Sequence, residues 1–204
     1  MLKKTLLLLC FGLILFISPA QAQKSHSDLL NEIGVDAGPV SIFGGFIVGT
    51  VDFFNALGSS MSHQTYSSRY FGVYNLHYYR QVKPWCQVGA KFTVEGSRIT
   101  RYTDSLQTAI HSISDDLLFT FMPSVRFTYL NRPWVRLYSG VDVGLGYLFS
   151  NIQGFSKDDS KGNKFLPAMN ITAFGVNVGK GFYGLFELNA GFDSIVKVGI
   201  GARF

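Results

Sequence analysis

The chain has 204 residues, of which 15% are charged and 15% aromatic, and it contains 22 glycines. This length suits one ordinary domain, whereas soluble domains usually carry more charge, about 25%. The formal net charge is +5 at pH 7, and Lys3 and Lys4 supply two of these charges. The remaining charge is too mild to indicate a nucleic-acid partner, and the apolar content excludes a largely disordered chain.

The first 22 residues have the pattern of a cleaved signal peptide. Two lysines precede an apolar run from Leu6 to Ile17, and the small-x-small sequence Ala20-Gln21-Ala22 follows. The run is shorter than the ~20 residues that a membrane-spanning helix needs, so we predict cleavage before Gln23. No later segment has 18 consecutive apolar residues. A mature chain embedded in a membrane would therefore be a closed β-barrel.

Residues 31–38 alternate between apolar and polar side chains, which predicts a strand. The connection over residues 39–68 is long, and its apolar residues recur at helical spacing: Ile42, Phe43, Phe46, Ile47, Val51, Phe54 and Leu57. This spacing predicts a short amphipathic helix over the barrel mouth or at the membrane surface. The alternative is that the connection extends the strands on either side.

Alternation predicts seven further strands, at residues 70–80, 85–97, 115–130, 134–150, 164–178, 185–192 and 194–204. Polar stretches at 102–114 and 151–163 indicate loops, and residues 82–84, 131–133 and 179–183 indicate short turns. Pro123 predicts a bulge, and the slip in alternation between Ala173 and Phe174 predicts another. The long connections would face outside, so both chain ends would lie on the periplasmic side.

Alternation alone also fits a secreted carrier with apolar side chains inside, and three features favour the inverted arrangement. Nine glycines lie on the polar face, where they would make room in a narrow interior. They are Gly34, Gly38, Gly89, Gly140, Gly144, Gly146, Gly191, Gly199 and Gly201. That face also carries balanced charges, as a buried polar core requires. These are Glu32, Asp36, Glu95, Asp142 and Glu187 with Lys91, Arg126, Arg136, Lys197 and Arg203.

Aromatic residues are the third feature. Tyr78, Trp85, Tyr129 and Trp134 fall near the expected periplasmic rim, and Tyr70, Phe119, Tyr147 and Phe192 fall near the other. Such belts suit the two interfaces of a membrane. The last strand has apolar residues at every second position and ends on Phe204.

This pattern resembles the small eight-stranded outer-membrane β-barrel family (OmpA/OmpX-like) over essentially the whole of residues 23–204. The resemblance implies an all-β fold, an eight-stranded antiparallel up-and-down transmembrane barrel whose first extracellular loop would here be partly helical. It further implies an outer-membrane location, a monomer, contacts with lipid and lipopolysaccharide, and Phe204 as a signal for the barrel-assembly machinery.

Catalytic chemistry is not indicated. Lipid A deacylases of this class carry a His-x-Ser pair on a strand, but Asp28, Thr65, Tyr79 and Ile113 follow the four histidines here at that spacing. His77 is expected to satisfy hydrogen bonds in the lumen rather than to bind a metal or shuttle a proton. We predict no cofactor and no enzyme activity, and a structural or surface-interaction role with a plugged polar lumen. The alternatives are a narrow channel for small or hydrophobic molecules and, less favoured, a lipid A-modifying enzyme.

Overall fold

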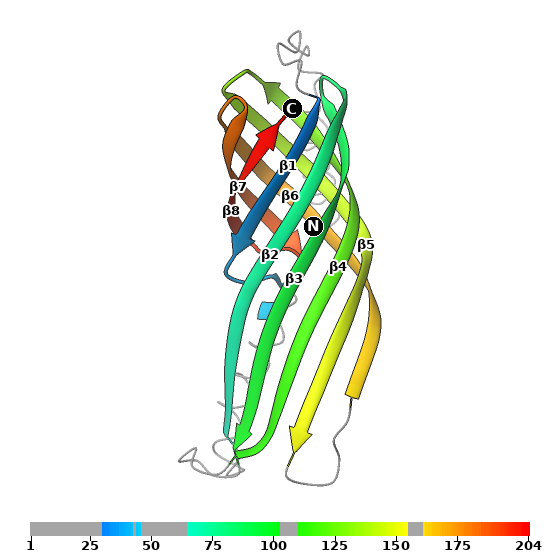
Figure 1. The fold of residues 1–204 in the computed structure, drawn as a ribbon, viewed down its shortest axis with the longest axis vertical. Coiled ribbons are helices and arrows are strands. Elements are labelled where there is room, and N and C mark those ends of the chain that lie inside the picture. Colours follow the sequence, from blue (N-terminus) through cyan, green and yellow to red (C-terminus); the bar gives the residue numbers. More distant parts are fainter. Residues whose placement is uncertain (1–29, 43, 46–64, 103–109, 155–160) are drawn as a thin grey trace, which may run out of the picture.

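In the computed structural model, the described residues are 30–42, 44–45, 65–102, 110–154 and 161–204, so the predicted signal peptide lies outside them. They form eight strands (Figure 1). The strands are β1 (Asn31–Gly38), β2 (Thr65–Lys83), β3 (Cys86–Tyr102), β4 (Ile110–Asn131), β5 (Val135–Gly154), β6 (Lys161–Val178), β7 (Phe182–Gly191) and β8 (Val196–Arg203). Each strand pairs antiparallel with its neighbours in sequence, and β1 pairs with β8, so the ring is closed.

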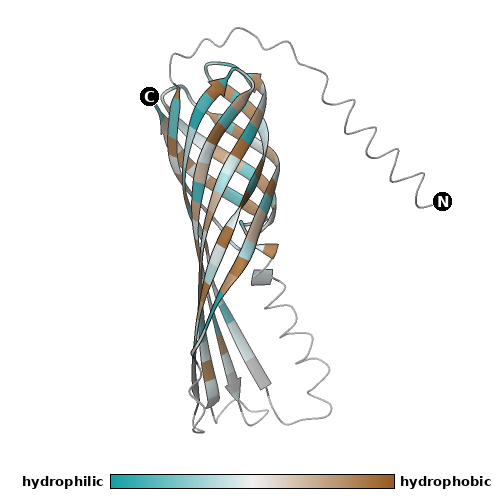
Figure 2. Ribbon diagram, turned by 90° about the vertical axis from the view of Figure 1, so that its right-hand side faces the viewer, coloured by the Kyte–Doolittle hydropathy of each residue, from teal (hydrophilic) through white to brown (hydrophobic). Residues whose placement is uncertain are grey.

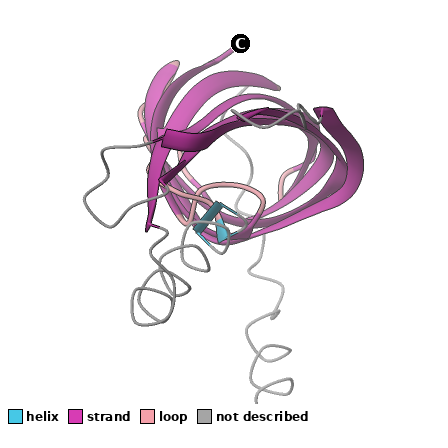
Figure 3. Cartoon of the chain, turned by 90° about the horizontal axis from the view of Figure 1, so that it is seen from below, coloured by secondary structure: helices cyan, strands magenta, loops and turns pink. Residues whose placement is uncertain are grey.

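The seam between β1 and β8 closes the barrel. Glu32 pairs with Arg203 and Val35 pairs with Ile200. The backbones of Asn31 and Phe204 exchange hydrogen bonds of 2.9 and 3.0 Å, which carries the pairing to the last residue. Seen from below, the strands enclose a ring (Figure 3). Among the described residues, no helix is long and apolar enough to cross a membrane.

Side chains alternate between an apolar exterior and a charged interior. Val141, Leu145 and Ile200 are 41%, 62% and 68% exposed, whereas Lys91 and Asp142 are buried. The same alternation runs along the ribbons of the closed part of the barrel (Figure 2). The inverted arrangement is therefore confirmed, the carrier with an apolar interior is excluded, and the architecture agrees with that of small eight-stranded outer-membrane barrels.

The strands differ greatly in length. β1, β7 and β8 have 8, 10 and 8 residues, whereas β2 to β6 have 17 to 22. The long strands extend beyond the short ones at the end away from the C-terminus (Figure 1). A tilted membrane-spanning strand needs about 9–11 residues, so the extra length forms a sheet that protrudes past the closed ring.

The loops predicted at 102–114 and 151–163 are accordingly wrong in extent. Strand pairing continues into both from either side, as Ser112 opposite Gly154 and Asn151 opposite Lys161 show. Most residues in these two ranges are polar, and a strand with both faces in water shows no apolar alternation. The sequence therefore did not indicate that the strands continue into the predicted loops.

The partly helical first loop is not supported by the described residues. Residues 42, 44 and 45 form one helical turn, in which the Gly45 N–H donates to the Ser41 carbonyl at 2.8 Å. Most of the predicted helix, residue 43 and residues 46–64, lies outside the described residues.

One predicted bulge is confirmed and the other is wrong. The register between β6 and β7 shifts between Thr172 and Phe174, where the alternation slips. At Pro123 there is no bulge, because the pairing of β4 with β5 has the same register at Phe121 and at Ser124. The ladder passes over the proline without an extra residue, and the bulge in this strand pair falls between Thr128 and Leu130 instead.

Candidate functional site

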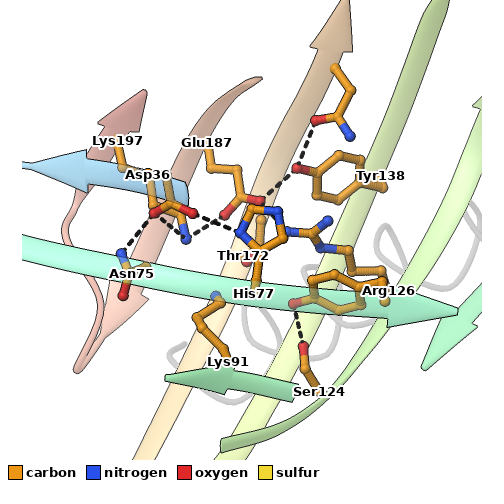
Figure 4. Close-up of polar contacts among 12 residues, drawn as sticks. Asp36, Asn75, His77, Lys91, Ser124, Arg126, Tyr138, Thr172, Glu187 and Lys197 are labelled. Carbon is orange, nitrogen blue, oxygen red and sulfur yellow. Dashed lines mark hydrogen bonds and ion pairs between the residues drawn. The ribbon is translucent and has the colours of Figure 1, made fainter. Parts of the chain in front are cut away.

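The interior of the barrel holds a cluster of buried ionic side chains, named here the lumen cluster (Figure 4). It comprises Glu32, Asp36, His77, Lys91, Glu95, Arg126, Arg136, Asp142, Glu187, Asp193, Lys197 and Arg203. All eleven interior residues expected from the sequence lie in it, and Asp193 is an addition. Because burying a lone charge costs several kcal/mol, the contacts of each member decide what the cluster can do.

Glu32 on β1 is the acceptor at the end of the lumen with the short turns. Its carboxylate accepts a hydrogen bond from the Arg126 guanidinium at 2.9 Å and another from the Arg136 guanidinium at 3.0 Å. The Arg203 Nε and the Asn177 amide donate to it as well, each at 3.2 Å. These donors come from four different strands, so one carboxylate ties β1 to β4, β5, β6 and β8 across the interior.

Glu187 on β7 joins this end to the middle of the lumen. It accepts hydrogen bonds from Arg126 at 2.7 Å and from the Tyr138 hydroxyl at 2.5 Å, and Lys197 lies 2.9 Å away. The Arg126 guanidinium also lies over two rings, 3.6 Å from the Tyr79 centroid and 4.5 Å from that of Tyr138. Carboxylates and aromatic faces thus surround this cation, an arrangement that suits a desolvated arginine.

Asp193 lies in the short link between β7 and β8 and binds both buried lysines. Its carboxylate is 2.8 Å from Lys91 Nζ and 2.6 Å from Lys197 Nζ, and it accepts the Asn75 amide at 2.7 Å. Lys91 also contacts Asp142 at 2.7 Å. Sequence reasoning missed this residue because the link has no alternation. Its signal would have been an acid between two strands whose interior already held two lysines.

His77 on β2 serves as a hydrogen-bonding group in the described structure. Its Nδ1 lies 2.9 Å from Asp36 and its Nε2 lies 3.4 Å from the Tyr183 hydroxyl. Asp36 also faces Lys197 at 3.3 Å and accepts the Asn75 amide at 2.7 Å. In the parts of the chain that are described, no three His, Cys, Asp or Glu side chains are arranged to hold a metal ion.

Glu95 on β3 occupies the opposite end of the lumen cluster, where the chain folds inward after β1. The Ser41 hydroxyl lies 3.0 and 2.9 Å from its two carboxylate oxygens, and the Tyr70 hydroxyl forms a further hydrogen bond with it. The turn at 41–45 lies within the outline of the ring (Figure 3). Ser41 also bridges to Ser194, which fixes this turn against the link before β8.

Tyr70 differs from expectation, since it was predicted to lie in the outer aromatic belt with Phe119, Tyr147 and Phe192. A register shift between Tyr70 and Gly72 reverses the side to which Tyr70 points. Gly72 has φ of +93°, a left-handed conformation that glycine adopts without strain. The bulge therefore turns one aromatic residue from the exterior to Glu95.

The remaining predicted residues lie on the exterior. Tyr78, Trp85, Tyr129 and Trp134 are all exposed, and they lie at the end with the short turns. Phe204 is exposed at the same end, where it pairs with Asn31. It stays a prediction that the four belt residues lie at a membrane interface. It also stays a prediction that Phe204 acts in assembly.

At the other side, charged residues follow the apolar exterior. Gly96 and Leu117 pair across β3 and β4, and Leu117 pairs with the exposed Phe149. Two residues further out along the strands, Arg69 pairs with Arg98, and Arg98 pairs with Asp115. The Arg98 Nε lies 2.5 Å from Asp115, and this carboxylate raises the pKa of the guanidinium. A row of charges thus follows directly on the apolar band.

Comparisons with known proteins add little to this geometry. No family model matches the chain, and no curated protein does. Among solved structures, it is similar to Ail, the attachment invasion locus protein of Yersinia pestis, with 13% identity, coverage of 85% of this chain and 95% of that one, and a TM-score of 0.42. It is also similar to Ail in complex with the heparin analogue sucrose octasulfate. The identity is 13%, the coverage is 85% of this chain and 95% of that one, and the TM-score is 0.43.

The chain is also similar to the N-terminal β-barrel domain of Pseudomonas aeruginosa OprF. The identity is 13%, the coverage is 87% of this chain and 100% of that domain, and the TM-score is 0.41. Likenesses at this level carry no functional argument, so a function for this protein has to rest on its own residues.

Proposed function

We propose that the protein is a monomeric outer-membrane β-barrel with a plugged lumen, which serves the envelope as a structural or surface-interaction protein and not as an enzyme. The observation that carries this proposal is the inversion of polarity, with charges buried and large apolar side chains exposed around the barrel. Exposed apolar surface costs about 25 cal/mol per Å² in water, and in a bilayer this cost disappears.

The orientation follows from the two ends of the apolar band. Trp85, Trp134 and their neighbours would lie at the periplasmic interface, where ring and polar edge suit the headgroup region. The row containing Arg69, Arg98 and Asp115 would lie at the outer interface. The protruding ends of β2 to β6 would then stand outside the cell, where a surface partner could reach them.

Lipopolysaccharide is the proposed lipid partner at this outer interface. Arg69 and Arg98 are directly opposite on neighbouring strands, and like charges in that position repel. Asp115 offsets one of them. A phosphate group bound between the two guanidiniums would remove the repulsion, and arginine recognises phosphate through paired hydrogen bonds.

The lumen cluster argues against the channel alternative. The Arg126 and Arg136 side chains reach from one wall to Glu32 on another, and both are buried. Water-filled barrels of this type use 16 or more strands, whereas eight strands leave room only for side chains.

The test is reconstitution of the full mature chain in planar bilayers and vesicles. We expect folded protein whose mobility in SDS gels changes on heating, with no unit conductance steps. Steady unit currents from the purified protein would refute the plugged lumen. Failure to insert into vesicles, with a soluble folded species instead, would refute the membrane location.

A further inference from the structure

Glu95 is a buried carboxylate that acts as a hydrogen-bond acceptor. The Gly44 N–H donates to the Ser41 hydroxyl oxygen at 2.8 Å, so that oxygen's acceptor role is used. The Ser41 proton is therefore available to Glu95, whose oxygens lie 3.0 and 2.9 Å away. The Tyr70 hydroxyl supplies a second hydrogen bond. Two hydroxyl groups that donate to one carboxyl group favour its ionised form, whereas its burial favours the neutral form.

No described cation neutralises this carboxylate. The other buried acids (Glu32, Asp36, Asp142, Glu187 and Asp193) each lie within 4 Å of Lys, Arg or His, whereas Glu95 has no such ion pair among the described residues. The described buried cations are Lys91, Arg126, Arg136, Lys197 and Arg203, one fewer than the acids. A protonated His77 would restore the count, but it contacts Asp36 and not Glu95.

The described residues that pack over Glu95 supply no basic side chain. They lie at positions 39–42, 44 and 45, none of which is lysine, arginine or histidine. Ser41 and the turn after it pack directly on the carboxylate, and even a Cβ added at Gly44 would lie only 2.1 Å from its Oε1. A large cationic ligand is therefore excluded at this point, and a single small ion is favoured.

The two cross-strand partners of Glu95 are apolar, and unpaired oxygens lie in the layer of the inner surface next to Glu95. Thr93 precedes it by two residues, so both side chains point inward from β3. Asn75 and Thr120 are the direct partners of Thr93 on the two neighbouring strands. The Asn75 Oδ1, Thr93 Oγ1 and Thr120 Oγ1 atoms are all buried, and none has a hydrogen-bond partner.

We infer that Glu95 holds a monovalent metal cation, Na⁺ or K⁺, with these neutral oxygens as further ligands. One carboxylate and several uncharged oxygens match a single positive charge and the preference of hard cations for oxygen. The ion would neutralise the last buried acid and connect β2, β3 and β4 at the extracellular end of the lumen. The site uses one acid, so it is compatible with the absence of a described multi-acid metal cluster.

The first test is the dependence of stability on the cation. The midpoint of heat-induced unfolding of the full mature chain in detergent micelles is measured in NaCl, KCl and N-methylglucamine chloride at equal ionic strength and pH 7. We expect a saturable rise of about 5 °C with Na⁺ or K⁺. Equal midpoints in all three salts, as a protonated Glu95 would give, would overturn the inference.

Two variants locate the site. Thr93→Val keeps the shape of the side chain, removes one oxygen and should raise the half-saturating cation concentration at least about tenfold. Glu95→Gln should abolish the cation dependence. Thr172→Val is the control, because the Thr172 hydroxyl is buried but already bonded to Asn189 at 2.7 Å. It should lower the midpoint and retain the cation dependence. If Thr93→Val behaved like this control, the neutral ligands would be wrong.

Discussion

The Arg126 guanidinium lies 3.6 Å from the centroid of the Tyr79 ring, in the middle of a barrel whose exterior is apolar. The same guanidinium donates to Glu32 at 2.9 Å and to Glu187 at 2.7 Å. Arg126 on β4 thus contacts carboxylates on β1 and β7 as well as an aromatic ring on β2. Its removal would leave both acids with fewer cations in a site that water does not reach.

Arg126→Met should therefore lower the free energy of unfolding by about 3–5 kcal/mol, because a buried ion pair that loses one partner leaves an uncompensated charge. Urea unfolding of the refolded protein in micelles measures the change. Arg132→Met, in an exposed turn, is the control and should change stability by less than about 0.5 kcal/mol. Adding Glu187→Gln to Arg126→Met should recover part of the loss, and a double variant less stable than the single one would contradict this account.

Gly89 should not tolerate a side chain. A Cβ there would lie 2.0 Å from the Tyr78 carbonyl oxygen and 2.7 Å from the Tyr79 ring, so Gly89→Ala should cost about 1–3 kcal/mol. Gly181→Ala is the matched control, since nothing lies within 4 Å of its Cβ position. Both variants are compared by urea unfolding, and equal stability would show that the barrel wall shifts freely at Gly89.

Phe204 is predicted to affect assembly in the cell but not the stability of the folded protein. We expect Phe204→Ala to reduce the folded, heat-modifiable protein in outer-membrane fractions several-fold, while refolding of the purified chain in micelles stays unchanged. Phe182→Ala removes another exposed aromatic residue near the same end and serves as the control. If Phe182→Ala lowered the yield in the membrane as much as Phe204→Ala, the last residue would have no special part in assembly.

The Arg69 and Arg98 pair should bind phosphate at the outer interface. Arg69→Gln and Arg98→Gln should each weaken the binding of lipopolysaccharide to protein in nanodiscs about tenfold, as the loss of one charge-assisted contact implies. Dephosphorylated lipopolysaccharide should bind wild type and variants alike. Arg132→Gln, at the opposite rim, should bind as wild type does. A preference for phosphate that survives both substitutions would place the lipid contact elsewhere.

The sequence predicted the closed part of the barrel well and the protruding part poorly. Alternation identified the inner face because apolar side chains on the exterior and charged side chains in the interior impose a period of two residues. Past Arg69 and Arg98 both faces meet water, and the pattern disappears although the strands continue. Strand length beyond the closed ring therefore depends on pairing between neighbouring strands, which a single sequence does not display.

The lumen cluster shows the same division. Members on regular strands, such as Lys91 and Arg136, follow from alternation. The member Asp193 and its neighbour in the lumen, Ser41, lie in irregular segments between strands. Tyr70 was wrongly assigned to the exterior, because the bulge at Gly72 reverses the alternation between inward and outward side chains. What could not be predicted is thus where a backbone departs from the two-residue repeat, and those departures bring Ser41, Tyr70 and Asp193 to the ions.

Lys197 and Arg203, which lie on β8, have a consequence for how the barrel would insert into the proposed membrane. They supply cations to Asp36, Asp193, Glu187 and Glu32, whose other partners come from earlier strands. An intermediate sheet without its last strand would present these acids to the bilayer with too few counter-charges. Closing the ring and neutralising its contents are therefore a single cooperative step, and insertion of this barrel should proceed without a long-lived open form.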